Sequence, residues 1–281
     1  MIRHCLLSLI SFLVLPTSAV ADEITDSIEV GGRMLKIPAP AGGFVRCDGV
    51  NAEWDKVMST MQAPTNRVLA NYGTQADQDA LRAGEGPDYS ENFNVQVMRT
   101  LEAKEFGTET FAGIKAETAK EVKNASAKIQ EEAGKIISEG GKKLADEMGV
   151  DAALSVSDTA MLGIFHEDAQ SFGFTMALKV SMTTPKGPEV AKSVVACIMQ
   201  PVNGRLLMFY STKPYGSEED RKKAEASVKE WAAATFAANP QVKGPPARRG
   251  IFDGSGRSAL IGAIGGVVVA AILALKKKIM G

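Results

Sequence analysis

The side chains best suited to acid–base or metal chemistry are few in this chain. It contains two histidines, His4 and His166, and only His166 lies outside the N-terminal apolar segment. A metal site would need further ligands at characteristic spacing, and no second histidine or cysteine pair supplies them near His166. A Ser-His-Asp site would have to use His166, but the sequence has neither Gly-x-Ser-x-Gly nor Ser-x-x-Lys to provide a nucleophile. We therefore interpret His166–Ala169 as a solvated turn.

Paired carboxylates are the other common route to acid–base chemistry. Glu131-Glu132 and Glu218-Glu219-Asp220 lie beside lysines in segments with helical periodicity. Solvated helix faces and favourable contact with a helix dipole account for both groups. We predict no catalytic, cofactor-binding or metal-binding residues, no cofactor, and a protein that is not an enzyme. The alternative is an envelope hydrolase whose site is assembled from scattered carboxylates.

Two cysteines, Cys47 and Cys197, follow the N-terminal segment that holds Cys5. In an oxidising compartment such a pair can form a disulfide, which would add about 5 kcal/mol of stability in the chain-entropy model. The other interpretation is two buried free thiols in strands. Both interpretations stay open, because the sequence does not show whether the two strands are neighbours.

The first 21 residues predict a secretory signal peptide. Arg3 and His4 form a short positive region, Cys5–Leu15 is an apolar stretch of the usual length, and Ala19-Val20-Ala21 is a small-x-small cleavage motif. Cleavage there would place the chain that follows outside the cytoplasm. The alternative is an uncleaved signal anchor, which would make the chain cross the membrane twice.

Residues 258–275 predict a transmembrane helix. This uncharged segment would form a helix of about 27 Å, close to the ~30 Å hydrocarbon core of a bilayer. Lys276, Lys277 and Lys278 follow at once and can hold that end among the lipid headgroups. We predict a single-pass anchor in the plasma (inner) membrane, with residues 276–281 as a cytoplasmic tail. The rival interpretation is a C-terminal signal whose tail is removed.

The anchor also offers a face for association. Gly262 and Gly266 have the Gly-x-x-x-Gly spacing that lets two transmembrane helices approach closely. One hypothesis is therefore a homodimer formed through this face.

Composition limits the class of partner. Removing Arg3 and the three tail lysines from 32 basic residues leaves 28 against 33 acidic ones, a net charge of about −5. This balance argues against nucleic acid as a partner. Residues 22–240 are enough for one large domain or two small ones, and we predict one extracytoplasmic domain. Residues 241–257 are rich in Pro, Gly and Arg without periodicity, which predicts a flexible linker.

Periodicity and turn residues predict the elements. The expected strands and strand pairs lie at 26–37 (a hairpin around Gly31-Gly32), 44–47, 67–72, 92–101, 153–165, 172–182, and 193–200 with 205–212 (a hairpin around Asn203-Gly204). The expected helices lie at 52–61, 74–82, 108–148 and 217–238. The hairpin around Asn203-Gly204 is apolar on both sides, which indicates a central position covered on both faces.

These elements predict an α+β fold. A mainly antiparallel sheet is packed by one long helix at about 108–148 and by a C-terminal helix at about 217–238, followed by the linker and one transmembrane helix. The order of elements resembles that of small α+β bacterial envelope domains of the PsbP/Mog1-like kind, and this resemblance implies a fold rather than a function. The predicted function is a membrane-anchored, non-enzymatic binding or adaptor module in a bacterial envelope, with another envelope protein as its partner.

Overall fold

The computed structural model describes residues 25–60, 64–123, 142, 153–184 and 187–242. The predicted signal peptide, almost all of the predicted linker, the membrane helix with Gly262 and Gly266, and the tail lie outside these residues. Within the described residues, no helix is both long and apolar enough to cross a membrane.

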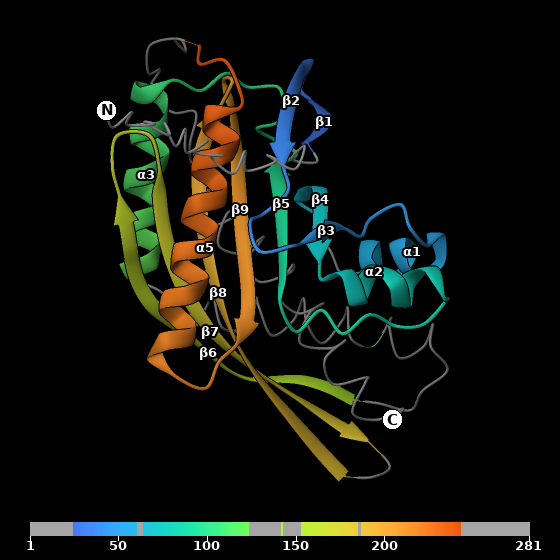
Figure 1. The fold of residues 1–281 in the computed structure, drawn as a ribbon. Helices are drawn as coiled ribbons and strands as arrows, with labels where there is room; N and C mark the ends of the chain where they lie inside the picture. Colours follow the sequence, from blue (N-terminus) through green and yellow to red (C-terminus); the bar gives the residue numbers. More distant parts are fainter. Residues whose placement is uncertain (1–24, 61–63, 124–141, 143–152, 185–186, 243–281) are drawn as a thin grey trace, which may run out of the picture.

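A seven-stranded antiparallel sheet forms the centre of the fold, and a separate two-stranded hairpin, β1–β2, packs beside it (Figure 1). The order of strands in the large sheet is β3-β4-β5-β9-β8-β7-β6. The strands are β1 (Thr25–Val30), β2 (Arg33–Pro38), β3 (Val45–Arg46), β4 (Asn66–Gly73), β5 (Asn92–Met98), β6 (Ala153–Glu167), β7 (Phe172–Thr184), β8 (Gly187–Val202) and β9 (Arg205–Pro214). The predicted α+β class with a mainly antiparallel sheet is confirmed.

The helices begin where the capping residues of the sequence place them. They are α1 (Ala52–Thr60), α2 (Gln75–Arg82), α3 (Thr108–Lys123) and α5 (Glu218–Ala237). Asn51 accepts from the first-turn N–H groups of α1, Thr74 and Asp77 form a capping box on α2, and Ser217 caps α5. Of the long helix predicted at 108–148, α3 accounts for the first 16 residues, and most of the rest lies outside the described residues.

The large sheet is covered on both faces. On one face, Phe111, Ile114 and Val122 of α3 pack against β7, β8 and β9. On the other face, Val228 and Trp231 of α5 pack with the β1–β2 hairpin against β5, β8 and β9. Figure 1 shows α5 in front of the sheet and α3 beside its β6 edge. The burial of both faces of the β8–β9 hairpin confirms its predicted central position.

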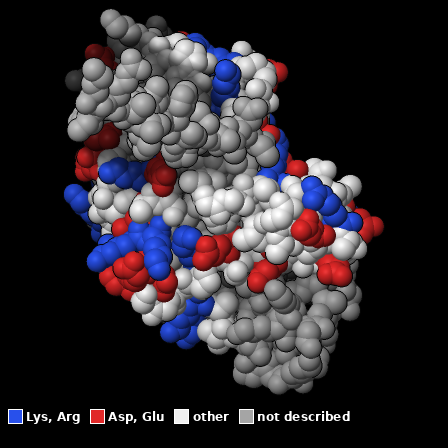
Figure 2. Space-filling model, in the orientation of Figure 1, with Lys and Arg blue, Asp and Glu red and all other residues white. Residues whose placement is uncertain are grey.

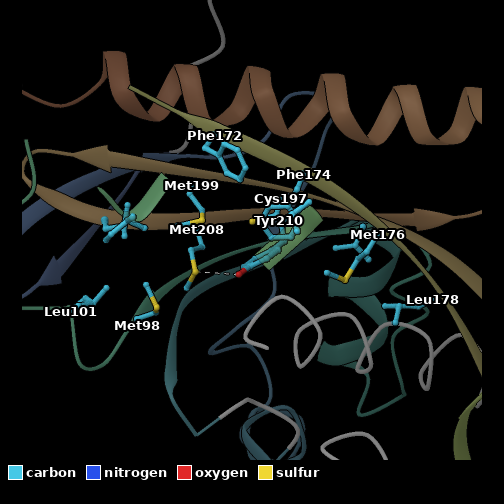
Figure 3. Packing of buried hydrophobic residues seen from close by; sticks show 14 of the residues in the cluster. Met98, Leu101, Phe172, Phe174, Met176, Leu178, Cys197, Met199, Met208 and Tyr210 are labelled. Atoms are coloured by element: carbon cyan, nitrogen blue, oxygen red, sulfur yellow. Dashed lines mark hydrogen bonds between the residues drawn. The ribbon is translucent and has the colours of Figure 1, made fainter. Parts of the chain in front are cut away.

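The two cores differ in character. The α5 side is aromatic: the Trp231 ring makes edge contacts with Tyr72, Phe93 and Phe209 at 5.1–5.6 Å. The α3 side is rich in sulfur, with Met176, Met199, Met208 and Cys197 on one face of three adjacent strands (Figure 3). Methionine fills irregular gaps because its unbranched side chain is flexible. The hydroxyl group of Tyr210 points to the sulfur of Met208 at 3.4 Å.

Several strands run further than predicted, whereas β5 ends at Met98 rather than at residue 101. β6 continues through His166 and Glu167, so the turn begins at Asp168 rather than at His166. β8 begins at Gly187, six residues before the predicted start at residue 193, and it includes Pro188. Proline has no N–H group to donate to a neighbouring strand. It is tolerated at position 188 because β9 ends at Pro214, opposite Ser193, so that β8 pairs with β7 but not with β9 at Pro188. Figure 1 shows this part of the β7–β8 hairpin extending beyond the body of the sheet.

Candidate binding pocket at one end of the sheet

Four chain connections meet at the end of the sheet where β6, β8 and α5 terminate, which we call the pole. They line a pocket of about 70 Å³ that is partly open to solvent. Its lining is apolar, amide or hydroxyl in character and consists of Phe106, Gly107, Thr108, Ala169, Gln170, Pro201, Gly204, Phe236, Gln241 and Val242. This volume is well below the roughly 300–1,000 Å³ of sites that enclose a whole small molecule.

The turn between β6 and β7 forms one wall, and the only histidine that the structure describes, His166, lies at the end of β6 beside it. Nε2 of His166 lies 2.8 Å from Oγ of Ser171 and 3.0 Å from Oδ2 of Asp168. Ser171 is buried, and its hydroxyl group donates to Oδ1 of Asp168 at 3.1 Å. The structure therefore brings a serine, a histidine and an aspartate together, and sequence reasoning missed Ser171 because it follows no nucleophile motif.

This arrangement does not have the geometry of a catalytic triad. In a triad, the carboxylate binds one ring nitrogen while the other nitrogen takes the proton of serine. Here both partners contact the same nitrogen of His166, and the Ser171 proton is directed to a carboxylate. Partial burial alone would raise the pKa of Asp168, but N–H groups of Gln170 and Ser171 bind its carboxylate and lower the pKa below 3.8. The contacts serve to hold the turn closed.

Lys115 fixes this turn to α3. Its ammonium group donates to the main-chain oxygen of Asp168 at 3.0 Å and lies 3.5 Å from a carboxylate oxygen of Glu167. Two walls of the pocket, the β6–β7 turn and the start of α3, are therefore connected directly.

Arg205 holds the opposite wall. It is only 7% exposed, and its guanidinium donates to four main-chain oxygens: Val30 at 3.2 Å, Gly31 at 2.6 Å, Lys104 at 2.9 Å and Gly204 at 3.4 Å. Burial, followed by the nearby charge of Arg33, lowers the pKa of Arg205, while Glu105 opposes the shift. Arg33 itself pairs with Glu105 and donates to Oδ1 of Asn203 at 3.2 Å. These contacts join the β1–β2 turn, the segment before α3 and the β8–β9 turn.

The last described residues form a strap over the β8–β9 turn. Asn239 exchanges two hydrogen bonds with the main chain of Lys36, at 2.9 and 2.7 Å. Gln241 donates to the main-chain oxygens of Phe236 and Asn239 at 2.8 and 2.9 Å. Gly204 leaves room for Val242, whose Cγ2 would be only 2.8 Å from a Cβ at that position. The strap therefore completes the pocket wall.

Buried amides also occur away from the pole, on the α3 side of β5. Nδ2 of Asn66 donates to Oε1 of Gln96 at 2.9 Å, and Nε2 of Gln96 donates to Oδ1 of Asn94 at 2.7 Å. All three residues are at most 2% exposed. A connected amide chain satisfies groups whose burial would otherwise cost free energy, so it fixes the position of β4 relative to β5.

In the structure Cys47 and Cys197 are buried free thiols, as the second of the two interpretations has them. Cys47 pairs with β4 through its N–H group, whereas Cys197 lies in β8. Because β4, β5 and β9 separate them at about 4.8 Å per strand, they lie several times further apart than a disulfide spans. Burial raises the pKa of Cys47 to about 11 and raises that of Cys197 further, so both thiols are neutral.

The described carboxylates at the pole, those of Glu105, Glu167 and Asp168, are engaged by Arg33, Lys115 and the β6–β7 turn. The carboxylates of Glu218 and Glu225 pair with Arg221 on α5, and Glu131-Glu132 lies outside the described residues. Among the residues that the structure describes, no cluster of three His, Cys, Asp or Glu side chains could hold a metal ion. Figure 2 shows acidic and basic side chains intermixed on the visible described surface. The pocket is therefore suited to contacts with apolar and hydrogen-bonding groups.

Comparison with known proteins gives distant structural neighbours. No protein-family model matches the chain, and no curated protein matches it. A point mutant of protein Mog1 has 11% identity and a TM-score of 0.32, covering 78% of this chain and 97% of its own. The Saccharomyces cerevisiae Ran-binding protein Mog1p has 11% identity and a TM-score of 0.25, with coverages of 77% and 90%. The cyanobacterial PsbP of Synechocystis has 13% identity and a TM-score of 0.27, with coverages of 78% and 96%. Similarity at this level carries no conclusion about function.

Proposed function

We propose that this protein is a single-pass, membrane-anchored extracytoplasmic module of a bacterial envelope that binds another envelope protein and does no chemistry on it. The lining of the pole pocket carries this proposal, because none of its ten residues has an ionisable side chain. Sites of acid–base or nucleophilic catalysis place titratable groups where they can reach the substrate. Apolar walls with a few amide and hydroxyl groups are instead typical of binding sites.

The sequence supports the location. The predicted signal peptide, linker and membrane helix together describe an ectodomain carried on a tether. The pocket lies where the chain leaves the domain, because Gln241 and Val242 belong both to the pocket wall and to the start of the predicted linker.

The rival function, an envelope hydrolase with scattered carboxylates, gains no support from this pocket. The hydroxyl group of Ser171, in the adjoining β6–β7 turn, is directed to Asp168 rather than to a free base. Turnover of esters, glycosides or peptides by the purified full chain would overturn the non-enzymatic proposal.

The direct test is crosslinking in native membranes with a tagged C-terminal tail, followed by mass spectrometry. We expect a reproducible heterologous partner whose crosslinks map around the pole. The variant Ala169→Trp, which fills the pocket from an exposed position, should reduce its recovery at least tenfold. The matched variant Ala226→Trp, exposed in the middle of α5, should leave recovery unchanged. Equal recovery from both variants would exclude the pocket as the binding site, and recovery of self-crosslinks alone would contradict a heterologous partner.

A further inference from the structure

The strap defines the point from which any tether must start. Asn239 binds the main chain of Lys36, and Gln241 binds the main-chain oxygens of Phe236, near the end of α5, and of Asn239. Val242 then rests over Gly204 in the β8–β9 turn. The last described residues therefore lie at the pole, and side-chain contacts fix their position there.

The opposite end of the domain lies far from the pole. β8 runs the whole way, from the tip of the β7–β8 hairpin to the β8–β9 turn at the pole. Val190 is 12 residues from the pole end of β8, which corresponds to about 40 Å at ~3.3 Å per residue. Met34, by contrast, lies near the pole, because Arg205 binds the carbonyl oxygens of the adjacent β1–β2 turn.

The predicted linker is shorter than this distance. Residues 243–257 provide fifteen residues between the strap and the predicted membrane helix. A flexible chain of that length has a typical end-to-end distance of about 20 Å. The predicted linker therefore keeps the pole close to the lipid headgroups. It is too short, on average, for the domain to invert and place the β7–β8 hairpin tip against the membrane.

We propose that the domain sits with its pole toward the bilayer across a gap of about 20 Å, and that the pocket receives a segment of a membrane-embedded protein. The proposal rests on the membrane anchor of the proposed function. A gap of about 20 Å is narrower than a small domain, which is roughly 30 Å across. An extended periplasmic segment of a neighbouring membrane protein fits this gap, whereas a folded soluble partner does not.

The orientation can be measured with two exposed apolar positions. Met34 near the pole is 58% exposed and Val190 on the far hairpin is 44% exposed. With Cys5 removed with the predicted signal peptide or replaced by serine, the remaining native thiols, Cys47 and Cys197, are buried, so a fluorophore attached to Met34→Cys or Val190→Cys labels one position only. Full-length protein would be placed in vesicles of phosphatidylethanolamine and phosphatidylglycerol that contain acceptor-labelled headgroups.

We expect energy transfer to the headgroups from position 34 to exceed that from position 190 at least twofold. Inserting forty Gly/Ser residues after Val242 lengthens the typical reach to about 40 Å, so the ratio should fall toward one. Equal transfer from the two positions in the unmodified chain, with the protein stably inserted, would overturn the orientation and leave the proposed function standing. Failure of the full chain to associate with vesicles or with native membranes would overturn the anchor and this inference together.

The partner class has its own test. Crosslinks from a photoreactive group at Gln170 should reach an integral membrane protein. Crosslinks from Gln170 only to soluble envelope proteins would contradict the proposed occupant while supporting a binding function for the pocket.

Discussion

Arg205 is the residue on which the geometry of the pole depends most. Among the residues that the structure describes, its guanidinium has no direct carboxylate partner, and it is stable when buried because four carbonyl oxygens from three chain segments surround it. The planar guanidinium presents N–H donors in several directions, so it can bind all four carbonyl oxygens at once. A lysine ammonium is a compact group and could not reach all four together.

Removing this guanidinium should loosen the pole. We expect Arg205→Ala to lower the free energy of unfolding by about 3 kcal/mol, because it leaves buried carbonyl oxygens without donors. The control is Arg82→Ala. Arg82 and Asp79 form an exposed ion pair, and loss of this pair should cost less than about 1 kcal/mol. Urea unfolding compares them; an equal cost would mean that the Arg205 contacts contribute no more than a surface pair.

The two thiols should be inert in the native protein. Cys47 and Cys197 are at most 2% exposed, and burial raises the pKa of Cys47 to about 11. We expect iodoacetamide at pH 8 to modify neither in native protein over a time in which both react in urea. Rapid native labelling, or a Cys47–Cys197 bridge found by mass spectrometry without reduction, would contradict the strand order.

Asp168 should make stability depend on pH in the acid range. Its pKa is lowered in the folded state, so its contribution is present above the unfolded carboxyl pKa of about 3.9 and is lost as pH falls through the folded value. Asp168→Asn should therefore destabilise the protein at pH 6, and the difference from wild type should shrink below about pH 4. Asp79→Asn controls for loss of a surface carboxylate, and a pH-independent difference for Asp168→Asn would contradict the shift.

At the scale of elements, the β1–β2 hairpin is attached to the fold through its turn. Gly31 and Gly32 both have positive φ, +53° and +79°, as a tight two-residue turn requires. Only Gly31 lies against another segment: a Cβ there would be 2.1 Å from the main-chain oxygen of Glu102.

Alanine at these neighbouring positions should separate backbone strain from packing. Gly32→Ala meets open space and should cost about 1–2 kcal/mol for the left-handed conformation alone. Gly31→Ala adds a backbone clash and should cost at least about 2 kcal/mol more, or displace the hairpin. Thermal and urea unfolding give the comparison, and equal costs would mean that the turn does not rest on the Glu102 segment in solution.

The edges of the large sheet are protected in different ways. β6 contains three irregularities in its pairing with β7, and β3 has only two residues. The part of β8 that continues past the end of β9 contains Pro188. Bulges, short strands and proline all hinder the addition of a further strand. We therefore expect partners to bind at the pole rather than by extending the sheet.

At the scale of the whole molecule, the two tryptophans report on different regions. Trp54 lies in α1, and Trp231 lies in α5 against the opposite face of the sheet. In Trp231→Phe, which keeps only Trp54, we expect the fluorescence and circular-dichroism transitions in urea to coincide, as in two-state unfolding. In Trp54→Phe the same coincidence is expected. A Trp54 transition at lower urea would show that the α1–α2 region unfolds separately.

The sequence by itself determined most of the local structure of this protein. The hairpins around Gly31-Gly32 and Asn203-Gly204, the caps at Thr74 and Ser217, and the alternating pattern of β7 depend on nearby residues, so they were predictable. The two-sided burial of β8–β9 was predictable for the same reason, since both of its faces are apolar.

Only the tertiary structure decided which distant residues meet. It set the strand order that separates Cys47 from Cys197 and placed α3 and α5 on opposite faces of the sheet. It also assembled the pocket from four connections and surrounded Arg205 with carbonyl oxygens from three segments. Such contacts depend on packing between elements far apart in the chain, and neither periodicity nor turn chemistry encodes that packing.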